Sequence, residues 1–285
     1  MFIMDRRKPE TIFISDLDGT LLQPDARLSA ETVRLLNKCI SDCKLFTIAT
    51  ARTPATVSGI LRDVEMRLPA IVMTGAAIWD KGTNTYSDLR YIDPHAVGQF
   101  VDLLHRKEFP IFLFTLVENV INIYHVGNGL NNIEREFIEE RINSPYKRFH
   151  VDLVGKESLP DTFDKTILCY GMQPTKESES VYRDALKIDN LRPQFYHDIY
   201  GPEIGIMEAF SPKATKAEAV IRMKERTGAK RVVVFGDNIN DLPMFEIADV
   251  AVAVDNALPE VKAAADIVIG PNTENSVARF IYEFE

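Results

Sequence analysis

The feature that most constrains the fold of this 285-residue chain is a short apolar run that ends in two acidic residues. Residues 12–14 are apolar and mostly β-branched, a pattern that suits a strand buried on both faces of a parallel sheet. Asp16 and Asp18 follow, and Gly19 can take backbone angles closed to other residues. Open α/β sheets bind ligands at the carboxyl ends of their strands, so we expect a ligand site here. By itself, the Asp-x-Asp pair also suits a polar turn after a buried strand.

Predicted strands and helices alternate on both sides of this run. Ser29 and Thr53 are N-cap residue types, and Pro54 suits the first position of a helix that continues to Val64. The other predicted strands are residues 45–50, 70–73, 231–235, 250–254 and 267–269, with a further helix over 215–226. This alternation predicts an α/β fold with a Rossmann-like, doubly wound parallel sheet.

The pattern changes between residues 81 and 209. Two apolar runs, 111–117 and 120–124, are separated by two residues, which is the spacing of a β-hairpin. Predicted helices begin near residues 93, 131 and 176, and further strands are predicted over 166–171 and 204–209. We therefore predict a core made of residues 1–80 and 210–285. An inserted α+β domain over 81–209 is expected to form an antiparallel sheet with helices on one face.

Composition excludes several classes of protein. The net charge of −9 argues against binding to nucleic acid or to an anionic membrane surface. The apolar runs are too short to span a bilayer, and residues 1–10 lack an apolar signal core, so we expect a cytoplasmic protein. Cys39 and Cys43 have i,i+4 spacing, but no second pair completes a metal site, and Cys39 continues an apolar helix face.

Four carboxylates follow apolar strands: Asp16 and Asp18 after the first, Asp237 and Asp241 after residues 231–235. If the two strands are neighbours, these side chains converge at one edge of the sheet. Like charges so close require either a cation or raised pKa values. A set of oxygen ligands without His or Cys selects a hard cation, most often Mg²⁺ where phosphate completes the shell. The alternative is that Asp237 and Asn240 cap a helix.

Together these motifs resemble those of the haloacid dehalogenase-like (HAD) hydrolase superfamily. The resemblance is carried by residues 16–20, Thr50, Lys216 and residues 236–241, in matching order and spacing. Residues 49–52, Ala-Thr-Ala-Arg, resemble the Thr-Gly-Arg signature of the Cof-type subfamily, and residues 252–257 resemble its stretch after the last metal motif. Cof-type proteins carry a large α+β cap between the second and third motifs, where the pattern changes here.

The resemblance implies a role for each matching residue. Asp16 is expected to be the nucleophile that forms an aspartyl-phosphate, and Asp18 to protonate the leaving oxygen and then activate water. Thr50 and Lys216 are expected to donate hydrogen bonds to the phosphoryl oxygens. The implied Mg²⁺ ligands are Asp16, the backbone carbonyl of Asp18, Asp237, and Asp241 directly or through water.

Some positions leave a choice open or depart from the family pattern. Lys213 competes with Lys216; we prefer Lys216 because it opens a helix and is followed by a small residue. Ala51 stands where the family has Gly, Thr74 where it usually has Asn, and Asn275-Ser276 replace an acidic-Gly pair. The expected substrate contacts are Thr20, Ala51, Arg52, Thr74 and Asn240.

The expected function is a Mg²⁺-dependent phosphatase that acts on a small phosphorylated metabolite, with sugar phosphates the favoured class. The alternatives are a phosphomutase on the same scaffold and a non-catalytic phosphate-binding regulatory protein. A transport ATPase of the P type shares the phospho-aspartate but needs membrane spans, which the sequence lacks. Cap side chains are expected to select the substrate, with His125, Tyr170 and His197 as candidates, and the oligomeric state stays open.

Overall fold

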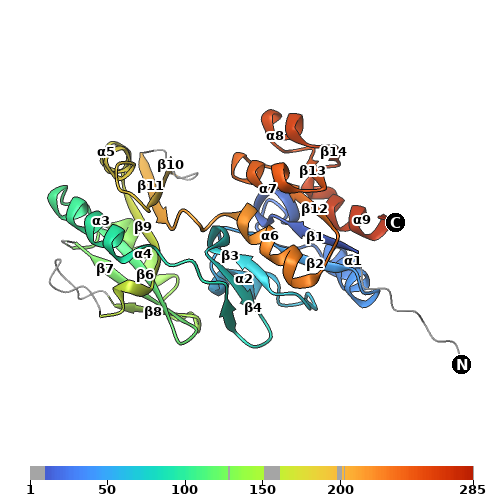
Figure 1. Cartoon of the computed structure of the whole chain (residues 1–285), viewed down its shortest axis with the longest axis horizontal. Coiled ribbons are helices and arrows are strands. Elements are labelled where there is room, and N and C mark those ends of the chain that lie inside the picture. Colours follow the sequence, from blue (N-terminus) through green and yellow to red (C-terminus); the bar gives the residue numbers. More distant parts are fainter. Residues whose placement is uncertain (1–9, 128, 151–160, 198–200, 202, 285) are drawn as a thin grey trace, which may run out of the picture. The chain divides into compact units, whose positions relative to one another are not determined.

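A computed structural model describes residues 10–127, 129–150, 161–197, 201 and 203–284. The chain forms two compact units (Figure 1). The core unit comprises residues 1–87 and 215–285, and the inserted unit comprises residues 88–214. The predicted boundaries lie a few residues earlier at both junctions. At the first junction the reason is that β4 (Ala77–Asp80) pairs antiparallel with β3 (Ala70–Val72) and β5 (Thr85–Ser87) pairs antiparallel with β4, so both strands belong to the core unit.

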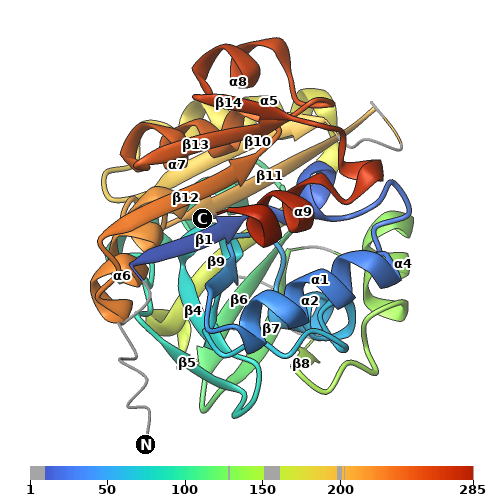
Figure 2. The same ribbon diagram turned by 90° about the vertical axis from the view of Figure 1, so that its right-hand side faces the viewer.

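The core unit is built on a parallel sheet with the strand order β14-β13-β12-β1-β2, of which β14, β13, β12 and β1 are labelled in Figure 2. Its strands are β1 (Thr11–Ser15), β2 (Leu45–Ile48), β12 (Arg231–Gly236), β13 (Val250–Val254) and β14 (Ile267–Ile269). A parallel bridge between Ala49 and Ile71 links β2 to β3. β1 and β12 are direct neighbours, so the segments that follow them meet at one edge of the sheet.

Helices cover both faces of this sheet (Figures 1 and 2). Phe280 of α9 packs its ring against Phe235, and Phe284, just after the helix, packs against Phe13, on the face that also carries α1. α6 and α7 lie on the other face, which confirms the doubly wound α/β core. The core helices are α1 (Ala30–Ser41), α2 (Pro54–Ile60), α6 (Lys216–Thr227), α7 (Leu242–Ile247), α8 (Pro259–Ala264) and α9 (Ser276–Glu283).

Two local predictions for the core unit have clear outcomes. The helix predicted to reach Val64 is shorter, because α2 ends at Ile60 and the chain continues as turns, with Leu61 and Val64 still buried. Cys39 is buried in the face of α1 as predicted, whereas Cys43 is exposed and has a left-handed backbone. The two thiols are therefore in different environments.

The inserted unit contains a six-stranded mixed sheet with the order β10-β11-β9-β6-β7-β8. Its strands are β6 (Ile111–Val117), β7 (Val120–Val126), β8 (Lys147–His150), β9 (Thr166–Pro174), β10 (Arg192–His197) and β11 (Ile204–Phe210). The predicted hairpin is confirmed: Glu118 and Asn119 both have positive φ, as the two central residues of a tight hairpin turn require. The expectation of an antiparallel sheet is wrong at one edge, because β7 and β8 are parallel.

Helices lie on both faces of this second sheet rather than on one. α3 (Pro94–Arg106) and α5 (Thr175–Ala185) pack over Leu113 and Cys169. α4 (Asn132–Glu139) packs on the opposite face, where Phe137 lies 5.3 Å from Phe112 and 5.5 Å from Tyr170 between ring centroids. Neighbouring residues of a strand point to opposite faces, so the two sets of contacts identify two covered faces.

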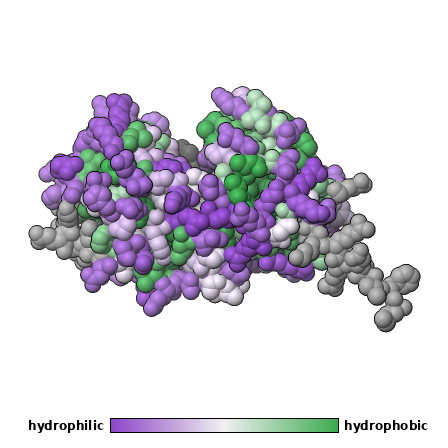
Figure 3. All heavy atoms as spheres, viewed as in Figure 1, coloured by the Kyte–Doolittle hydropathy of each residue, from purple (hydrophilic) through white to green (hydrophobic). Residues whose placement is uncertain are grey.

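One face of the molecule is mainly polar. On the face drawn in Figure 3, hydrophilic side chains predominate, and hydrophobic ones form separate areas among them. Among the described residues, no helix combines the length and the apolar character that crossing a membrane demands. The apolar side chains instead form the two sheet cores described above.

Candidate active site

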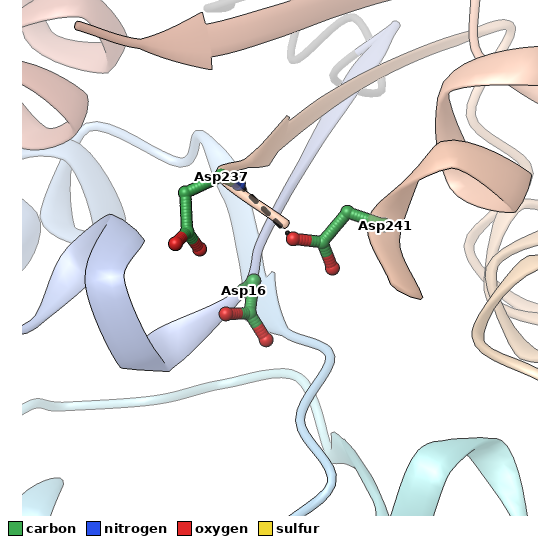
Figure 4. A group of neighbouring side chains, drawn as sticks. All are labelled: Asp16, Asp237 and Asp241. Atoms are coloured by element: carbon green, nitrogen blue, oxygen red, sulfur yellow. Dashed lines mark hydrogen bonds between the residues drawn. The ribbon is translucent and has the colours of Figure 1, made fainter. Parts of the chain in front are cut away.

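Three carboxylates meet where β1 and β12 end (Figure 4). Asp16 follows β1, Asp237 follows β12, and Asp241 ends the short helical turn Ile239–Asp241. One oxygen atom from each residue lies within 4.8 Å of the other two. Asp16 and Asp241 are buried and Asp237 is half-buried. The predicted convergence of these three residues is therefore present, and the cluster could hold a metal ion.

Lys216 enters this cluster from the first position of α6. Its Nζ donates hydrogen bonds to Oδ1 of Asp16 at 2.6 Å and to Oδ1 of Asp241 at 2.7 Å, and the residue is only 2% exposed. The helix begins there because the Thr215 hydroxyl caps it by accepting from the N–H of Glu218. Lys213 is exposed and belongs to the other compact unit. The geometry thus brings Lys216 to the carboxylates.

The acidic residues are themselves held in place by hydrogen bonds. Oδ2 of Asp241 accepts from the backbone N–H of Asp237 at 3.1 Å, the bond dashed in Figure 4, and from that of Asn238 at 3.2 Å. The Thr20 hydroxyl donates to Oδ1 of Asp237 at 2.7 Å. Thr20 was expected to contact substrate, but in this structure its hydroxyl orients a carboxylate.

Burial and mutual repulsion shift the ionisation of the cluster. Burial raises the pKa of Asp16 to about 7 against the opposing charge of Lys216, and Asp241 adds to the rise. Burial also raises the pKa of Asp237 to about 6, although the Thr20 hydrogen bond opposes this. Burial disfavours the charge of Lys216, but Asp16 and Asp241 outweigh it and raise the pKa of the ammonium group. Burial is the largest cause of both raised carboxylate pKa values, and repulsion from the neighbouring carboxylates adds to it.

Asp18 lies at the tip of a tight turn beside the cluster. Asp18 (φ −74°, ψ 124°) and Gly19 (φ 75°, ψ −11°) have the angles of the two central residues of a type II turn. A Cβ atom on Gly19 would lie 2.3 Å from Oδ2 of Asp237, so only glycine fits. The Asp18 carboxylate is 52% exposed and accepts two hydrogen bonds from Arg52, at 2.7 Å and 2.6 Å. The prediction that four carboxylates converge is therefore wrong for Asp18, whose side chain is not part of the three-carboxylate cluster.

The second motif lies beside the end of β2. Thr50 is buried, and its hydroxyl accepts from the backbone N–H of Arg52 at 3.1 Å. Ala51 does not have a positive φ. Its backbone therefore does not need the conformational freedom of the glycine that the family has at this position. Thr74 has a left-handed backbone with φ 55°, which an asparagine adopts more readily than a β-branched residue. Asn240 is exposed within the turn before Asp241.

The candidate selectivity residues of the inserted unit differ in accessibility. His125 is 2% exposed and lies 3.7 Å from the buried Glu134, so it is a core residue rather than an accessible contact. Tyr170 is half-buried and stacks on Phe137. His197 is exposed. Burial therefore argues against His125 as a substrate contact.

Sequence reasoning missed two asparagines near the turn that carries Asp18. Nδ2 of Asn256 donates to the backbone carbonyl of Gly19 at 2.7 Å, and Nδ2 of Asn272 donates to that of Leu22 at 2.7 Å. Asn256 lies within residues 252–257, the stretch already singled out by its resemblance to the Cof-type subfamily. That resemblance was the available signal, but it assigned no role to the residue.

Comparison with known proteins agrees with this geometry. The sequence model of the haloacid dehalogenase-like hydrolase family matches residues 13–281. The chain belongs to this family. The crystal structure of TM0651 from Thermotoga maritima superposes on this HAD-like hydrolase with a TM-score of 0.76 at 21% identity, covering 97% of this chain and 98% of the other. The subclass IIB sugar phosphatase BT4131 gives a TM-score of 0.70 at 19% identity, covering 96% and 98%.

Curated relatives of this HAD-like hydrolase are phosphatases. The pyridoxal phosphate phosphatase YbhA of Escherichia coli is 28% identical over 284 residues, which is 94% of this chain and 96% of the relative. A 5-amino-6-(5-phospho-D-ribitylamino)uracil phosphatase of Bacillus subtilis, YwtE, is 25% identical over 93% of this chain and 95% of its own. The chain is accordingly a phosphoric monoester hydrolase of the Cof-type, with the cap that the fold shows.

Proposed function

We propose that this HAD-like phosphatase hydrolyses the phosphate ester of a small hydroxylated metabolite, with sugar phosphates the favoured class, through a phosphorylated Asp16. The observation that carries the proposal is the convergence of Asp16, Asp237, Asp241 and Lys216 at the ends of β1 and β12. The activities of the relatives support the substrate class, since pyridoxal phosphate, a ribityl phosphate and sugar phosphates are all phosphate esters of small molecules.

In the proposed first step, a carboxylate oxygen of Asp16 attacks phosphorus while the bond to the ester oxygen breaks. Asp18 gives its proton to that leaving oxygen, so the product is a neutral alcohol. Lys216 and Thr50 donate hydrogen bonds to the phosphoryl oxygens, where negative charge accumulates. The carboxylate nucleophile divides one difficult displacement into two easier ones.

In the proposed second step, Asp18 takes a proton from a water molecule as that water attacks the phosphorus of the phosphorylated Asp16. The bond between phosphorus and the Asp16 oxygen breaks, which releases inorganic phosphate and restores the carboxylate. Asp18 thereby regains the proton needed for the next turnover. Its exposed position at a turn tip suits a group that serves both leaving oxygen and water.

The carboxylate cluster fits a divalent cation. Its donors are all oxygen, two of its residues are buried, and Lys216 supplies a single positive charge against three carboxylates. We propose that Asp16, Asp237 and the backbone carbonyl of Asp18 hold Mg²⁺, with Asp241 bound directly or through water. When bound, the ion neutralises negative charge shared between the carboxylates and the phosphoryl group.

We further propose that the core unit carries the chemistry and that the inserted unit acts as the substrate-selecting cap. All proposed catalytic residues lie in the core unit. A cap that contacts the leaving group and excludes bulk water increases both selectivity and the strength of electrostatic interactions at the reacting atoms.

The test is phosphate release from a panel of phosphorylated metabolites with Mg²⁺. Asp16→Asn should lose turnover by more than about a thousandfold while keeping its fold, because the nucleophile is gone. Asp25→Asn, an exposed control in the core unit, should match the parent. Near-parental turnover in Asp16→Asn, without deamidation back to aspartate by mass spectrometry, would overturn the proposal. Transfer of phosphate to a second hydroxyl, in place of its release, would identify a phosphomutase.

A further inference from the structure

The loop between β13 and α8 bonds to both strand-end segments of the active site, although it contributes none of the proposed catalytic groups. Nδ2 of Asn256 donates to the carbonyl of Gly19 at 2.7 Å. Two residues later, the backbone N–H of Leu258 donates to the carbonyl of Asp237 at 3.0 Å. One short loop therefore contacts the turn that carries Asp18 and the residue that follows β12.

Both polar atoms of the Asn256 side-chain amide make hydrogen bonds. Its Oδ1 accepts from the backbone N–H of Asn272 at 2.9 Å, while Nδ2 of Asn272 donates to the carbonyl of Leu22 at 2.7 Å. The two asparagines thus bond to two carbonyls of the segment that follows β1, at Gly19 and at Leu22. Because both ends of the Asn256 amide are bonded, its orientation relative to Gly19 is defined.

The position of the Asp18 carboxylate depends on this turn. The carboxylate is half exposed and pairs with the partly exposed Arg52. The backbone around it is restrained by the left-handed Gly19, whose carbonyl is the atom that Asn256 holds. A shift of about 1 Å in a catalytic group can cost on the order of a hundredfold in rate.

We propose that Asn256 is a positioning residue that fixes the Gly19 carbonyl and thereby aligns Asp18 for proton transfer to the leaving oxygen. This inference rests on the proposed role of Asp18. It predicts a dependence on the leaving group: an alkyl phosphate needs protonation of its poor leaving oxygen, whereas p-nitrophenyl phosphate releases a stable phenolate with little help.

The experiment compares kcat/KM for p-nitrophenyl phosphate and for the best alkyl phosphate of the metabolite panel, since kcat/KM reports the transfer to Asp16. The variants are Asn256→Ala, Asn256→Asp and Asp18→Asn. Asn256→Asp keeps an acceptor for the Asn272 N–H, but it replaces the donor to Gly19 with a carboxylate oxygen and adds a negative charge. It therefore also tests the bond to Gly19 if the alanine variant does not fold. Asn37→Ala is the matched control, because Asn37 makes the same pair of bonds, to the Asp63 carbonyl (2.9 Å) and from the Glu65 N–H (2.8 Å).

Both Asn256 variants should lose at least about tenfold more kcat/KM on the alkyl phosphate than on p-nitrophenyl phosphate, with KM changed less than about threefold. Asp18→Asn should show the same pattern more strongly, and Asn37→Ala should show none. Equal losses on both substrates in the Asn256 variants, beside a clear leaving-group dependence in Asp18→Asn, would overturn the positioning role alone. No leaving-group dependence in Asp18→Asn would overturn the acid role of Asp18, and the role of Asn256 with it.

Discussion

Lys216 places a positive charge among buried carboxylates. This single residue is therefore expected to contribute both to the activity and to the stability of the protein. Its ammonium group bonds to Asp16 and Asp241, both buried. Removing one partner from a buried charge pair typically costs about 3–5 kcal/mol, because the other charge is left without compensation. The same donor faces the nucleophile, so its loss is expected to affect the reaction as well.

We predict that Lys216→Ala lowers turnover by about 10²–10³-fold, the usual cost of removing a preorganised donor from developing charge. The same variant should unfold at a lower urea concentration than the parent. Lys213→Ala, at an exposed position three residues earlier, should change neither quantity measurably. Steady-state kinetics and urea titrations of the two variants make the comparison, and similar activities would mean that Lys216 does not contact the reacting groups.

At the scale of structural elements, the turn after β1 shows how tightly the backbone is packed against the site. Gly19 combines φ 75° with a 2.3 Å approach of its missing Cβ position to Asp237. A side chain at this position must therefore displace either the turn or the carboxylate. Gly59, in α2, is exposed and has no atom within 4 Å of the same position.

We predict that Gly19→Ala reduces turnover more than about a hundredfold, because Asp18 or Asp237 must move. Gly59→Ala should leave turnover unchanged and raise the free energy of unfolding by about 0.5–1 kcal/mol, since alanine favours helix more than glycine. Kinetics and chemical denaturation of the two variants test this pair. A fully active Gly19→Ala protein would show that the turn tolerates a side chain and that its close packing is not required.

In the inserted unit, β11 carries a buried carboxyl group, Glu208, whose ionisation is unfavourable. Glu208 is buried, and burial raises its pKa from 4.5 to about 7, although Tyr196 and Arg192 oppose the shift. Between these two pH values the folded state keeps a proton that the unfolded state has released. The stability contributed by this group is therefore present below pH 4.5 and is lost as the pH rises towards 7.

We predict that the Glu208→Gln variant does not lose this stability, because glutamine cannot ionise. The free energy of unfolding of the variant minus that of the parent should therefore be larger at pH 8 than at pH 5, by on the order of 2–3 kcal/mol. Urea midpoints from far-UV circular dichroism at the two pH values measure it. Glu177→Gln, exposed on α5, is the control and should show no such change. A constant difference between parent and Glu208→Gln at both pH values would contradict the prediction.

At the scale of the whole molecule, one fluorescent side chain reports on the core unit alone. The sequence has one tryptophan, Trp79, which is buried in β4 of the core unit. Its fluorescence therefore reports unfolding of the unit that holds the carboxylate cluster. A ligand that binds only the folded state stabilises it in proportion to RT ln(1 + [L]/Kd), so the cluster should make this unit sensitive to metal.

We predict that saturating Mg²⁺ raises the midpoint of the Trp79 thermal transition by about 5–10 °C, and that chelation reverses the rise. Asp237→Ala should lose more of this shift than Asp241→Ala, whose carboxylate is already bonded to Lys216 and two backbone N–H groups. An equal shift in the parent and Asp237→Ala would remove Asp237 from the ligand set. Glu208→Gln should leave the Trp79 transition unchanged.

Much of the core was predictable from local patterns. Apolar runs such as residues 12–14 predict buried parallel strands. The two residues that separate the apolar runs 111–117 and 120–124 predict the hairpin. The cap residue Ser29 is predicted from its residue type, because its side chain bonds within one turn of helix. The motifs of residues 16–20 and 236–241 predicted the convergence of Asp16, Asp237 and Asp241, since each follows a strand and parallel neighbours end at one edge.

Only the tertiary structure decided the features that depend on contacts between distant segments. The short strands β8 and β10 carry weak local patterns and form because an existing sheet edge pairs with them. Thr20 bonds to Asp237 and Asn256 bonds to Gly19, and in both pairs the partners are far apart in the sequence. His125 is likewise buried by packing rather than by its local sequence. The physical reason is that a side chain's type fixes which bonds it can make, while its partner is chosen by the packing that surrounds it.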